Sequence, residues 1–392
     1  MRVSTIFAAA VSIVIAAAAA GTAQAQAPVK IGFVGVLSGP QALLGQDQYN
    51  GFMLFVEHNG GKLGGVPVEI LKEDSQLKPE LAVQIVQKLI EKEQVPIITG
   101  VTFSNEMMAI QKPVTEKGVF LIGSNAGPSP IAGPLCSPYQ FITSFQLDSM
   151  AEGFGLFAND KGYKRVYLMA PNYQAGKDFL AGFKRTYKGE IVDEVYTAME
   201  QPDYLAELTQ VAAAAPDAVF VFYPGAMGIN FVRQYNQLGL IKKIPLLSQG
   251  AVDGSTLGAL QDAALGVYNG AVWGPDLDNA ANRQFVDEFE KKYHRIPTMF
   301  AAQSYDAAQL ISSAIAKVKG NVSDKPAFMA ALAAADFPSV RGDFKFANNH
   351  FPIQNIYVQQ VAKDAKGRVS LETVATPLKN YRDTYAARCK SN

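Results

Sequence analysis

The sequence predicts an α/β fold in which mostly parallel sheets are flanked by helices and arranged as two units. Three observations support this. Buried apolar runs alternate with helical stretches from residue 29 to 123, a segment dense in glycine and proline follows at 124–141, and a second alternation runs from 148 to 250. Such alternation implies parallel strands joined by helices that cover both faces of a sheet.

The elements of the first unit follow in order. Strands are expected at 29–37, 66–74, 95–100 and 119–123, and helices at 45–60, at 79–93 and from Asn105 onward. The helix at 79–93 carries the strongest signal, because Pro79 suits a helix N-terminus and apolar residues recur on one face.

The second unit continues the pattern. Helices are expected at 148–162, 176–187, 203–215 and 229–240, and strands at 165–171, 190–198, 217–224 and 244–250. Two or three long helices between 280 and 336 and a β-rich end, 339–361 and 367–374, have no sheet of their own. They must return to the earlier units, so the chain is expected to cross between two lobes more than once.

The N-terminus has the pattern of a secretory signal peptide. Arg2 precedes an apolar segment at 6–20 and the small-residue pattern that ends at Ala25. Cleavage is expected after Ala25, giving a signal peptide of residues 1–25. No cysteine follows the apolar segment and no later run reaches the ~18 apolar residues of a membrane helix, so a soluble, exported protein is expected.

The composition suits packed domains and opposes a nucleic-acid partner. The chain is 48% hydrophobic and 18% charged, with 35 basic and 35 acidic residues, whereas nucleic-acid binding favours a basic face. The two cysteines, Cys136 and Cys389, are expected to pair in an exported chain. Two free thiols remain the alternative.

The sequence offers little for an enzyme. His58, His294 and His350 are scattered without metal-ligand spacing, so they are expected on the solvated surface. The GxGxxA match at 153–158 falls inside a helix, residues 175–177 lack the first glycine of a phosphate loop, and no GxSxG occurs. No catalytic residue, metal or cofactor is therefore expected, although catalysis by dispersed residues remains an alternative.

Ligands of open parallel sheets bind beyond the carboxyl ends of the strands. The segments there are 37–40, 102–105, 123–127, 171–176, 223–226 and 248–254, and most of their residues are small, uncharged and rich in donors. In "GVTFSNEMMA", at 100–109, a polar turn opens a helix, which can hold an anion on free backbone N–H groups. Taken alone, this stretch fits an ordinary capped loop better.

The order of several motifs resembles a known family. "KIGFVGVLSGP", "KEDSQLKPELAVQIVQKLI", "GVTFSNEMMAIQKPVTEKGVFLIGSNAGPSPIAG", "PNYQAGKDFLAGFKR" and "FVFYPGAMGINFVRQYNQLGL" together resemble the type I periplasmic solute-binding proteins of ABC transporters, in their branched-chain amino acid-binding branch. The resemblance implies two lobes joined by three crossovers, with residues 28–143 and 275–352 in one lobe and 144–274 and 353–392 in the other. It also implies a periplasmic monomer that closes on its ligand and meets a membrane permease.

The resemblance assigns roles at the strand ends. It implies that a ligand carboxylate is held by Ser104 most directly, together with Ser124, Asn125 and Ala126. The complete set of expected ligand-binding residues is Ser38, Thr102, Ser104, Asn105, Ser124, Asn125, Ala126, Tyr173, Gln174, Tyr223, Gln249 and Asp253.

The second lobe departs from the amino acid pattern. Gln249 stands where leucine-binding relatives carry an acidic residue for the ligand's ammonium group, and an amide brings no counter-charge. Asp253 is a possible substitute. Ala175 stands where those relatives tend to have tyrosine, so Tyr173 and Tyr223 are expected to flank a flat ligand, with structural packing as the alternative for both.

Several motifs also resemble the subgroup that binds benzoate- or cinnamate-type acids, and an aromatic carboxylate is the expected ligand. An aliphatic amino or keto acid, a neutral amide or a urea-like solute remain alternatives. So does a role in passing ligand to a separate sensor, while the signal peptide opposes a cytoplasmic repressor.

Overall fold

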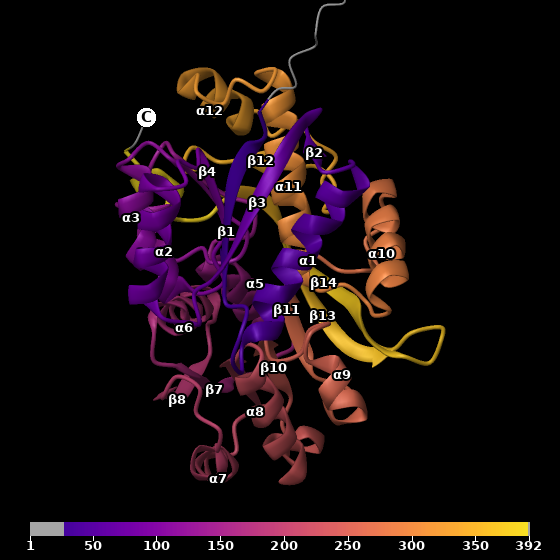
Figure 1. Ribbon diagram of the computed structural model, residues 1–392. Helices are drawn as coiled ribbons and strands as arrows, with labels where there is room; N and C mark the ends of the chain where they lie inside the picture. Colours follow the sequence, from indigo (N-terminus) through magenta and orange to yellow (C-terminus); the bar gives the residue numbers. More distant parts are fainter. Residues whose placement is uncertain (1–26, 391–392) are drawn as a thin grey trace, which may run out of the picture.

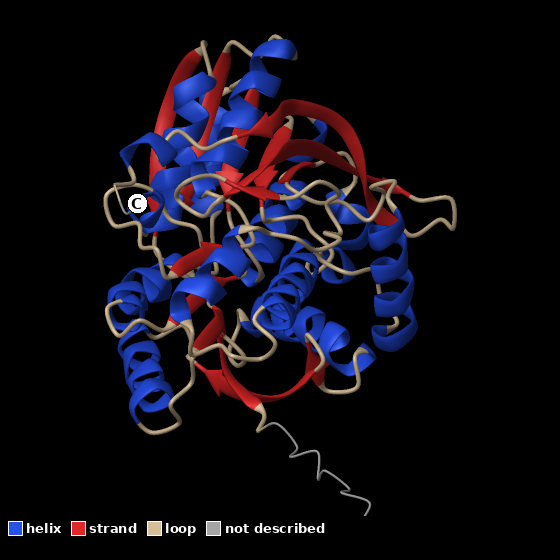
Figure 2. Ribbon diagram, turned by 90° about the horizontal axis from the view of Figure 1, so that it is seen from above, coloured by secondary structure: helices blue, strands red, loops and turns tan. Residues whose placement is uncertain are grey.

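The structure is a computed structural model that describes residues 27–390. It contains two lobes, each built around one sheet and lying one above the other in Figure 1. Helices surround the strands of both sheets when the molecule is seen from above (Figure 2). This confirms the α/β fold of two mostly parallel sheets. The expected signal peptide lies outside the described residues.

The sheet of the first lobe has the order β2-β3-β1-β4-β5-β6. Its strands are β1 (Val29–Gly35), β2 (Lys62–Leu63), β3 (Val66–Asp74), β4 (Ile97–Gly100), β5 (Phe120–Gly123) and β6 (Gln140–Ile142). All pairs are parallel except β2 with β3. The carboxyl ends of β1, β4 and β5 therefore meet at one edge of the sheet.

The sheet of the second lobe has the order β12-β13-β11-β10-β9-β7-β8, and β14 pairs with β13. Its strands are β7 (Arg165–Pro171), β8 (Glu190–Thr197), β9 (Ala218–Phe222), β10 (Leu246–Gln249), β11 (Tyr268–Ala271), β12 (Lys345–Phe346), β13 (Pro352–Lys363) and β14 (Val369–Tyr381). Strands β7 to β11 are parallel, and β13 is antiparallel to its neighbours. The turn between β13 and β14 projects at the edge of the molecule in both views (Figure 1, Figure 2).

Twelve α-helices connect or cover these strands in the described range 27–390. They are α1 (Ala42–His58), α2 (Pro79–Glu91), α3 (Ser104–Thr115), α4 (Ser129–Ala132), α5 (Leu147–Asp160), α6 (Gln174–Thr186), α7 (Leu205–Ala214), α8 (Ala226–Gln237), α9 (Leu257–Leu260), α10 (Ala280–Tyr293), α11 (Met299–Lys317) and α12 (Lys325–Ala333). No helix within residues 27–390 is long and apolar enough to cross a membrane.

The late elements return to the earlier sheets. Helix α11 packs on α1, and α12 places Phe328 against Phe120 of β5 with ring centroids 5.0 Å apart. Strand β13 pairs with β11 of the second lobe. The chain thus passes between the lobes after β6, after β11 and at the start of β13.

A buried arginine joins two of these crossovers. Arg341 Nη1 donates to the carbonyl of Ser144 at 2.9 Å and to Gln354 Oε1 at 2.8 Å. Its Nη2 also donates to the carbonyl of Thr143, and its Nε donates to Asp306 Oδ2 of α11 at 3.0 Å. One guanidinium therefore links the segment after β6, the start of β13 and a helix of the first lobe.

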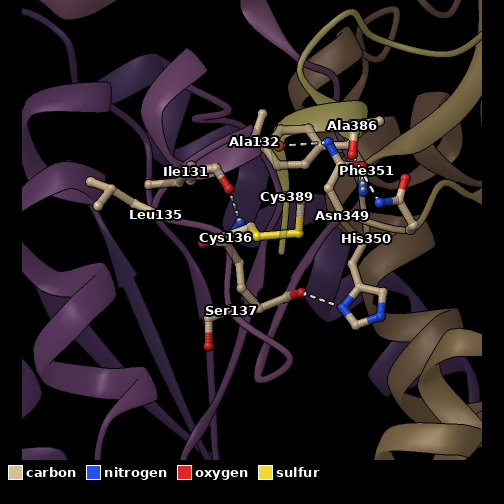
Figure 3. The surroundings of a disulfide bond; sticks show 12 residues. Ile131, Ala132, Leu135, Cys136, Ser137, Asn349, His350, Phe351, Ala386 and Cys389 are labelled. Atoms are coloured by element: carbon tan, nitrogen blue, oxygen red, sulfur yellow. Dashed lines mark hydrogen bonds between the residues drawn. A yellow bond between two sulfur atoms is a disulfide. The ribbon is translucent and has the colours of Figure 1, made fainter. Parts of the chain in front are cut away.

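The expected disulfide between Cys136 and Cys389 is present, with the two Cα atoms 5.6 Å apart (Figure 3). It fastens the C-terminal tail to the loop after α4. Nearby, Asn349 Nδ2 donates to the carbonyl of Ala132 at 2.8 Å. The tail around Cys389 therefore lies against the first lobe, although residues 353–392 were expected in the second.

One histidine differs from the expected surface placement. The ring of His350 stacks on Phe141 with centroids 4.0 Å apart, and its Nδ1 lies 3.0 Å from the carbonyl of Gln140. Burial lowers the pKa of His350. This histidine packs beside the disulfide because the chain turns back along β6 before β13 begins.

Candidate ligand-binding site between the lobes

Strand β4 ends in an unusual backbone turn. Gly100 and Val101 have φ values of 98° and 64°, which a β-branched residue rarely adopts. Val101 is held there because its N–H donates to the carbonyl of Val34 at 2.7 Å and its carbonyl accepts from the N–H of Ala126 at 3.2 Å. Such strained positions cluster at ligand-binding sites. Here the turn directs the start of α3 toward the second lobe.

Helix α3 begins at Ser104 without a side-chain cap. The preceding residue, Phe103, has an extended backbone and makes no side-chain capping bond. The N–H groups of a first helical turn lack partners inside the helix, so this end is suited to an anion. The Ser104 hydroxyl is nearly buried, at 3% exposure for the residue. Within residues 27–390 it has no hydrogen-bond partner.

A cavity of about 40 Å³ lies between the lobes at this helix end. This is more space than one water molecule needs. Six of the residues expected from the sequence line it: Thr102, Ser104, Asn125, Ala126, Tyr173 and Gln249. All of its lining residues are uncharged.

Most of the cavity wall is apolar and aromatic. Nine further lining residues come from both lobes: Leu44, Phe103, Phe145, Leu147, Met150, Phe179, Phe222, Met299 and Phe300. The ring of Phe222 lies 4.2 Å from that of Phe179 and 6.1 Å from that of Tyr173, and Tyr173 approaches Phe103 of the first lobe at 6.4 Å. Rings in such offset and tilted arrangements favour a flat aromatic partner.

The polar groups of the first lobe differ in availability. Thr102 Oγ1 accepts from the N–H of Val36 at 3.1 Å and donates to Gln48 Oε1 at 2.7 Å. Asn125 Nδ2 donates to the carbonyl of Thr102 at 2.6 Å. These side chains brace the loop, whereas the Ser104 hydroxyl is free to bind a ligand.

Gln249 lies at the second-lobe side of the cavity and is 1% exposed. Its Nε2 donates to the carbonyl of Gly270 at 2.9 Å and contacts Met150 Sδ at 3.4 Å. Its Oε1 has no partner within residues 27–390. The side chain is therefore anchored in the second lobe and brings no charge to the cavity.

Four other expected residues lie outside the cavity. Ser38 is exposed near Asp74. Ser124 is fully buried, where its hydroxyl accepts from Gln48 Nε2 at 3.1 Å and lies 2.6 Å from Ser304 Oγ. Gln174 donates to Asp178 at 2.8 Å. Asn105 follows Ser104 in α3 but does not line the cavity.

Tyr223 and Asp253 are also placed elsewhere. Tyr223 is fully buried in the second-lobe core, where its hydroxyl lies 3.2 Å from Thr197 Oγ1. It packs on Tyr204 as a core residue, which was the alternative for this position. Asp253 lines a separate, larger cavity and accepts from the N–H of Ser255 at 2.7 Å. Asp253 therefore adds no charge to the wall of the smaller cavity.

Two buried carboxyl groups lie near the cavity without lining it. Burial raises the pKa of Glu106, in the first turn of α3, to about 7. Burial, reinforced by the charge of Asp148, raises the pKa of Asp178 in α6 to about 6, against opposing hydrogen bonds from Ser129 and Gln174. Both carboxyl groups beside the cleft are therefore weaker acids than ordinary carboxyl groups.

The lobes touch directly, so the structure is a closed form. The N–H and Oγ of Ser129 in the first lobe donate to the carboxylate of Asp178 at 2.8 and 2.7 Å. Gln41 Oε1 accepts from the N–H of Ala226, at the start of α8, at 3.3 Å. The two lobes are therefore held together across the cavity by a few hydrogen bonds and by the contact between the rings of Phe103 and Tyr173.

The sequence interpretation missed the hydrophobic lining. Phe103, Phe179 and Phe222 have the same sequence pattern as ordinary core residues, and only the position of Phe222 at the end of β9 could have distinguished it. Successive side chains of a strand point to opposite faces. Phe222 therefore faces the cavity and its neighbour Tyr223 faces the core.

No group of three or more His, Cys, Asp or Glu residues suited to a metal occurs between residues 27 and 390.

The two lobes, the crossovers and the closed cleft define a protein that binds a small ligand between two α/β lobes. The chain belongs to the periplasmic binding protein family, which matches residues 28–367. This confirms the resemblance seen in the sequence motifs.

Three relatives illustrate the similarity. A solute-binding protein of an ABC transporter from R. palustris, solved in complex with benzoate, is 32% identical and covers 93% of this chain and 100% of its own, with a TM-score of 0.88. A second, from Rhodopseudomonas palustris BisB5 with 3,4-dihydroxybenzoic acid, is 29% identical over 91% of this chain and 99% of its own, with a TM-score of 0.84. The Leu/Ile/Val-binding protein homolog 6 of Brucella melitensis is 28% identical over 86% of this chain and 89% of its own.

Replacing Gly225 with alanine should hinder closure. Gly225 has φ 60°, and a Cβ there would lie 2.1 Å from Gln41 Oε1 and 2.6 Å from Leu44 Cδ1 of the other lobe. We expect Gly225→Ala to weaken ligand affinity at least tenfold in calorimetry. Gly162→Ala is the matched control, because Gly162 also has positive φ (75°) but a Cβ there meets nothing within 4 Å. Equal affinities of the two variants would contradict a contact that limits closure.

Proposed function

We propose that this protein is the periplasmic solute-binding component of an ABC uptake transporter and that it binds an aromatic carboxylate of the benzoate or cinnamate type. The observation that carries the proposal is the cavity itself, which is uncharged, lined by aromatic rings and bordered by the uncapped start of α3. The ligand complexes of the two Rhodopseudomonas relatives support this class of ligand.

The carboxylate is assigned to the first lobe. Ser104 supplies an unpaired hydroxyl at the start of α3, where backbone N–H groups and the helix dipole favour negative charge. Asn125 and Ala126 shape the adjoining wall. A hydrogen bond to a charged group contributes about 1.5–3 kcal/mol, so these groups can orient an acid without a cationic side chain.

The ring is assigned to the aromatic wall formed by Tyr173, Phe179 and Phe222 of the second lobe. Amino acids are disfavoured there because no carboxylate lines the cavity, and an unpaired buried ammonium group costs several kcal/mol. Gln249, which is uncharged, stands at the position where an acidic residue would be needed to pair with the ammonium group of an amino acid.

Ligand binding closes the two lobes and leaves the ligand chemically unchanged. A ligand shifts the open–closed equilibrium only by its preference for the closed form. Ser104 and Tyr173 lie on opposite lobes, so a ligand that touches both favours closure. The closed monomer would then deliver the acid to a membrane permease.

Calorimetric titration of the mature protein with benzoate, 4-hydroxybenzoate and leucine tests the proposal. We expect saturable binding of an aromatic acid near micromolar, about −8 kcal/mol, and none of leucine. Tight binding of leucine with no response to either aromatic acid would overturn the assignment.

Ser104→Ala should weaken binding of the aromatic acid by about 1.5–3 kcal/mol, roughly 10- to 150-fold, because it removes a hydrogen bond to a charged group. Ser38→Ala is the matched control, since Ser38 follows β1 but is exposed and outside the cavity. If the two variants bind equally well in calorimetry, Ser104 does not hold the carboxylate.

Affinity for benzoate should fall as the pH rises from 6 to 8. Burial raises the pKa of Glu106 to about 7, so this carboxyl gains negative charge over that range, two residues after Ser104, while the ligand stays ionised. Glu106→Gln should flatten the pH dependence measured by calorimetry. A dependence that persists unchanged in Glu106→Gln would assign the effect to another group.

A further inference from the structure

A second, larger cavity lies between the lobes beside the ligand site. Its volume is about 550 Å³, within the usual range of ligand pockets, whereas the ligand site has about 40 Å³. Residues 294–299 before and at the start of α11 form one wall, and residues 253–258 after β10 form another. This cavity therefore offers much more free space than the ligand site.

Two residues, Gly250 and Met299, line both cavities. Gly250 has no side chain, and Met299, the first residue of α11, has a flexible thioether side chain that adapts easily to new packing. Ser104 and Asn125, the polar groups at the carboxylate end, line only the smaller cavity. The two cavities therefore adjoin at Gly250 and Met299, and neither Ser104 nor Asn125 lies between them.

The larger cavity also has chemistry suited to an aromatic group with a hydrogen-bond donor. Trp273 and Ala271 provide apolar surface. Asp253 and Asn269 line the cavity and are each 4% exposed. Within residues 27–390, Asp253 Oδ2 and Asn269 Oδ1 have no hydrogen-bond partner. Buried acceptors without a donor are costly, so a phenolic hydroxyl would be a favourable neighbour.

We propose that the larger cavity is an extension of the ligand site and receives the distal part of aromatic acids longer than benzoate, with the Met299 side chain moving aside. This rests on the proposed function. The carboxylate end remains at Ser104, the first ring occupies the smaller cavity and the distal group enters beside Trp273.

The test compares two methionine variants with two probes, benzoate and biphenyl-4-carboxylate, by calorimetry. Met299→Ala removes a side chain at which the two cavities adjoin. Met150→Ala removes the same side chain from a wall of the smaller cavity alone. We expect the ratio of biphenyl-4-carboxylate affinity to benzoate affinity to rise at least tenfold in Met299→Ala and to rise less in Met150→Ala. An unchanged ratio in Met299→Ala, or an equal rise in both variants, would overturn the extension.

A crystal structure of the wild-type protein with biphenyl-4-carboxylate provides a second measurement that does not depend on variant stability. The distal ring in contact with Trp273 would support the extension, and a distal ring placed elsewhere would refute it. Failure of wild-type protein to bind benzoate would instead refute the proposed function. Binding of benzoate with an unchanged ratio in Met299→Ala would refute only the extension.

Discussion

The structure depends on one buried ion pair beside the crossovers between the lobes. Arg341 and Asp306 are 3% and 0% exposed at their side chains, with Nη2 and Oδ2 2.9 Å apart. The same guanidinium binds backbone carbonyls after β6 and Gln354 in β13. Removing one partner of a buried pair leaves an uncompensated charge and costs about 3–5 kcal/mol. Two of the three crossovers are thus held at one point.

That fixed point explains how weak contacts can control the cleft. Away from Arg341, closure rests on the hydrogen bonds from Ser129 to Asp178, on the bond to Gln41 and on the contact between Phe103 and Tyr173. Each is modest, so the open and closed forms can differ by only a few kcal/mol. In the proposed function, a ligand that bridges Ser104 and the second-lobe rings shifts the equilibrium toward the closed form through this differential contact. Because no charged residue lines the cavity, the carboxylate of the proposed ligand would be the only full charge within it.

The fold was largely predictable from the sequence, whereas the site was only partly so. Strands β3 and β7 match the expected ranges 66–74 and 165–171 because apolar runs between turn residues leave few alternatives. Ser104, which the family resemblance led us to expect at the ligand carboxylate, lines the cavity at the start of α3. Of the aromatic wall, Tyr173 was expected from the sequence, whereas Phe179 and Phe222 were not, because cavity-lining phenylalanines have the same pattern as core residues. Tyr223 was expected at the site, whereas the adjacent Phe222 lines the cavity, because successive side chains of a strand point to opposite faces. Asp253 lies too close in sequence to Gln249 for spacing alone to place it in another cavity.

A crystal structure of the mature protein with benzoate would show where the carboxylate and the ring of the ligand lie. We expect closed lobes, the carboxylate within hydrogen-bonding distance of Ser104 Oγ and the ring among Tyr173, Phe179 and Phe222. Benzoate bound with its carboxylate away from α3, or with its ring outside that aromatic wall, would contradict this expectation.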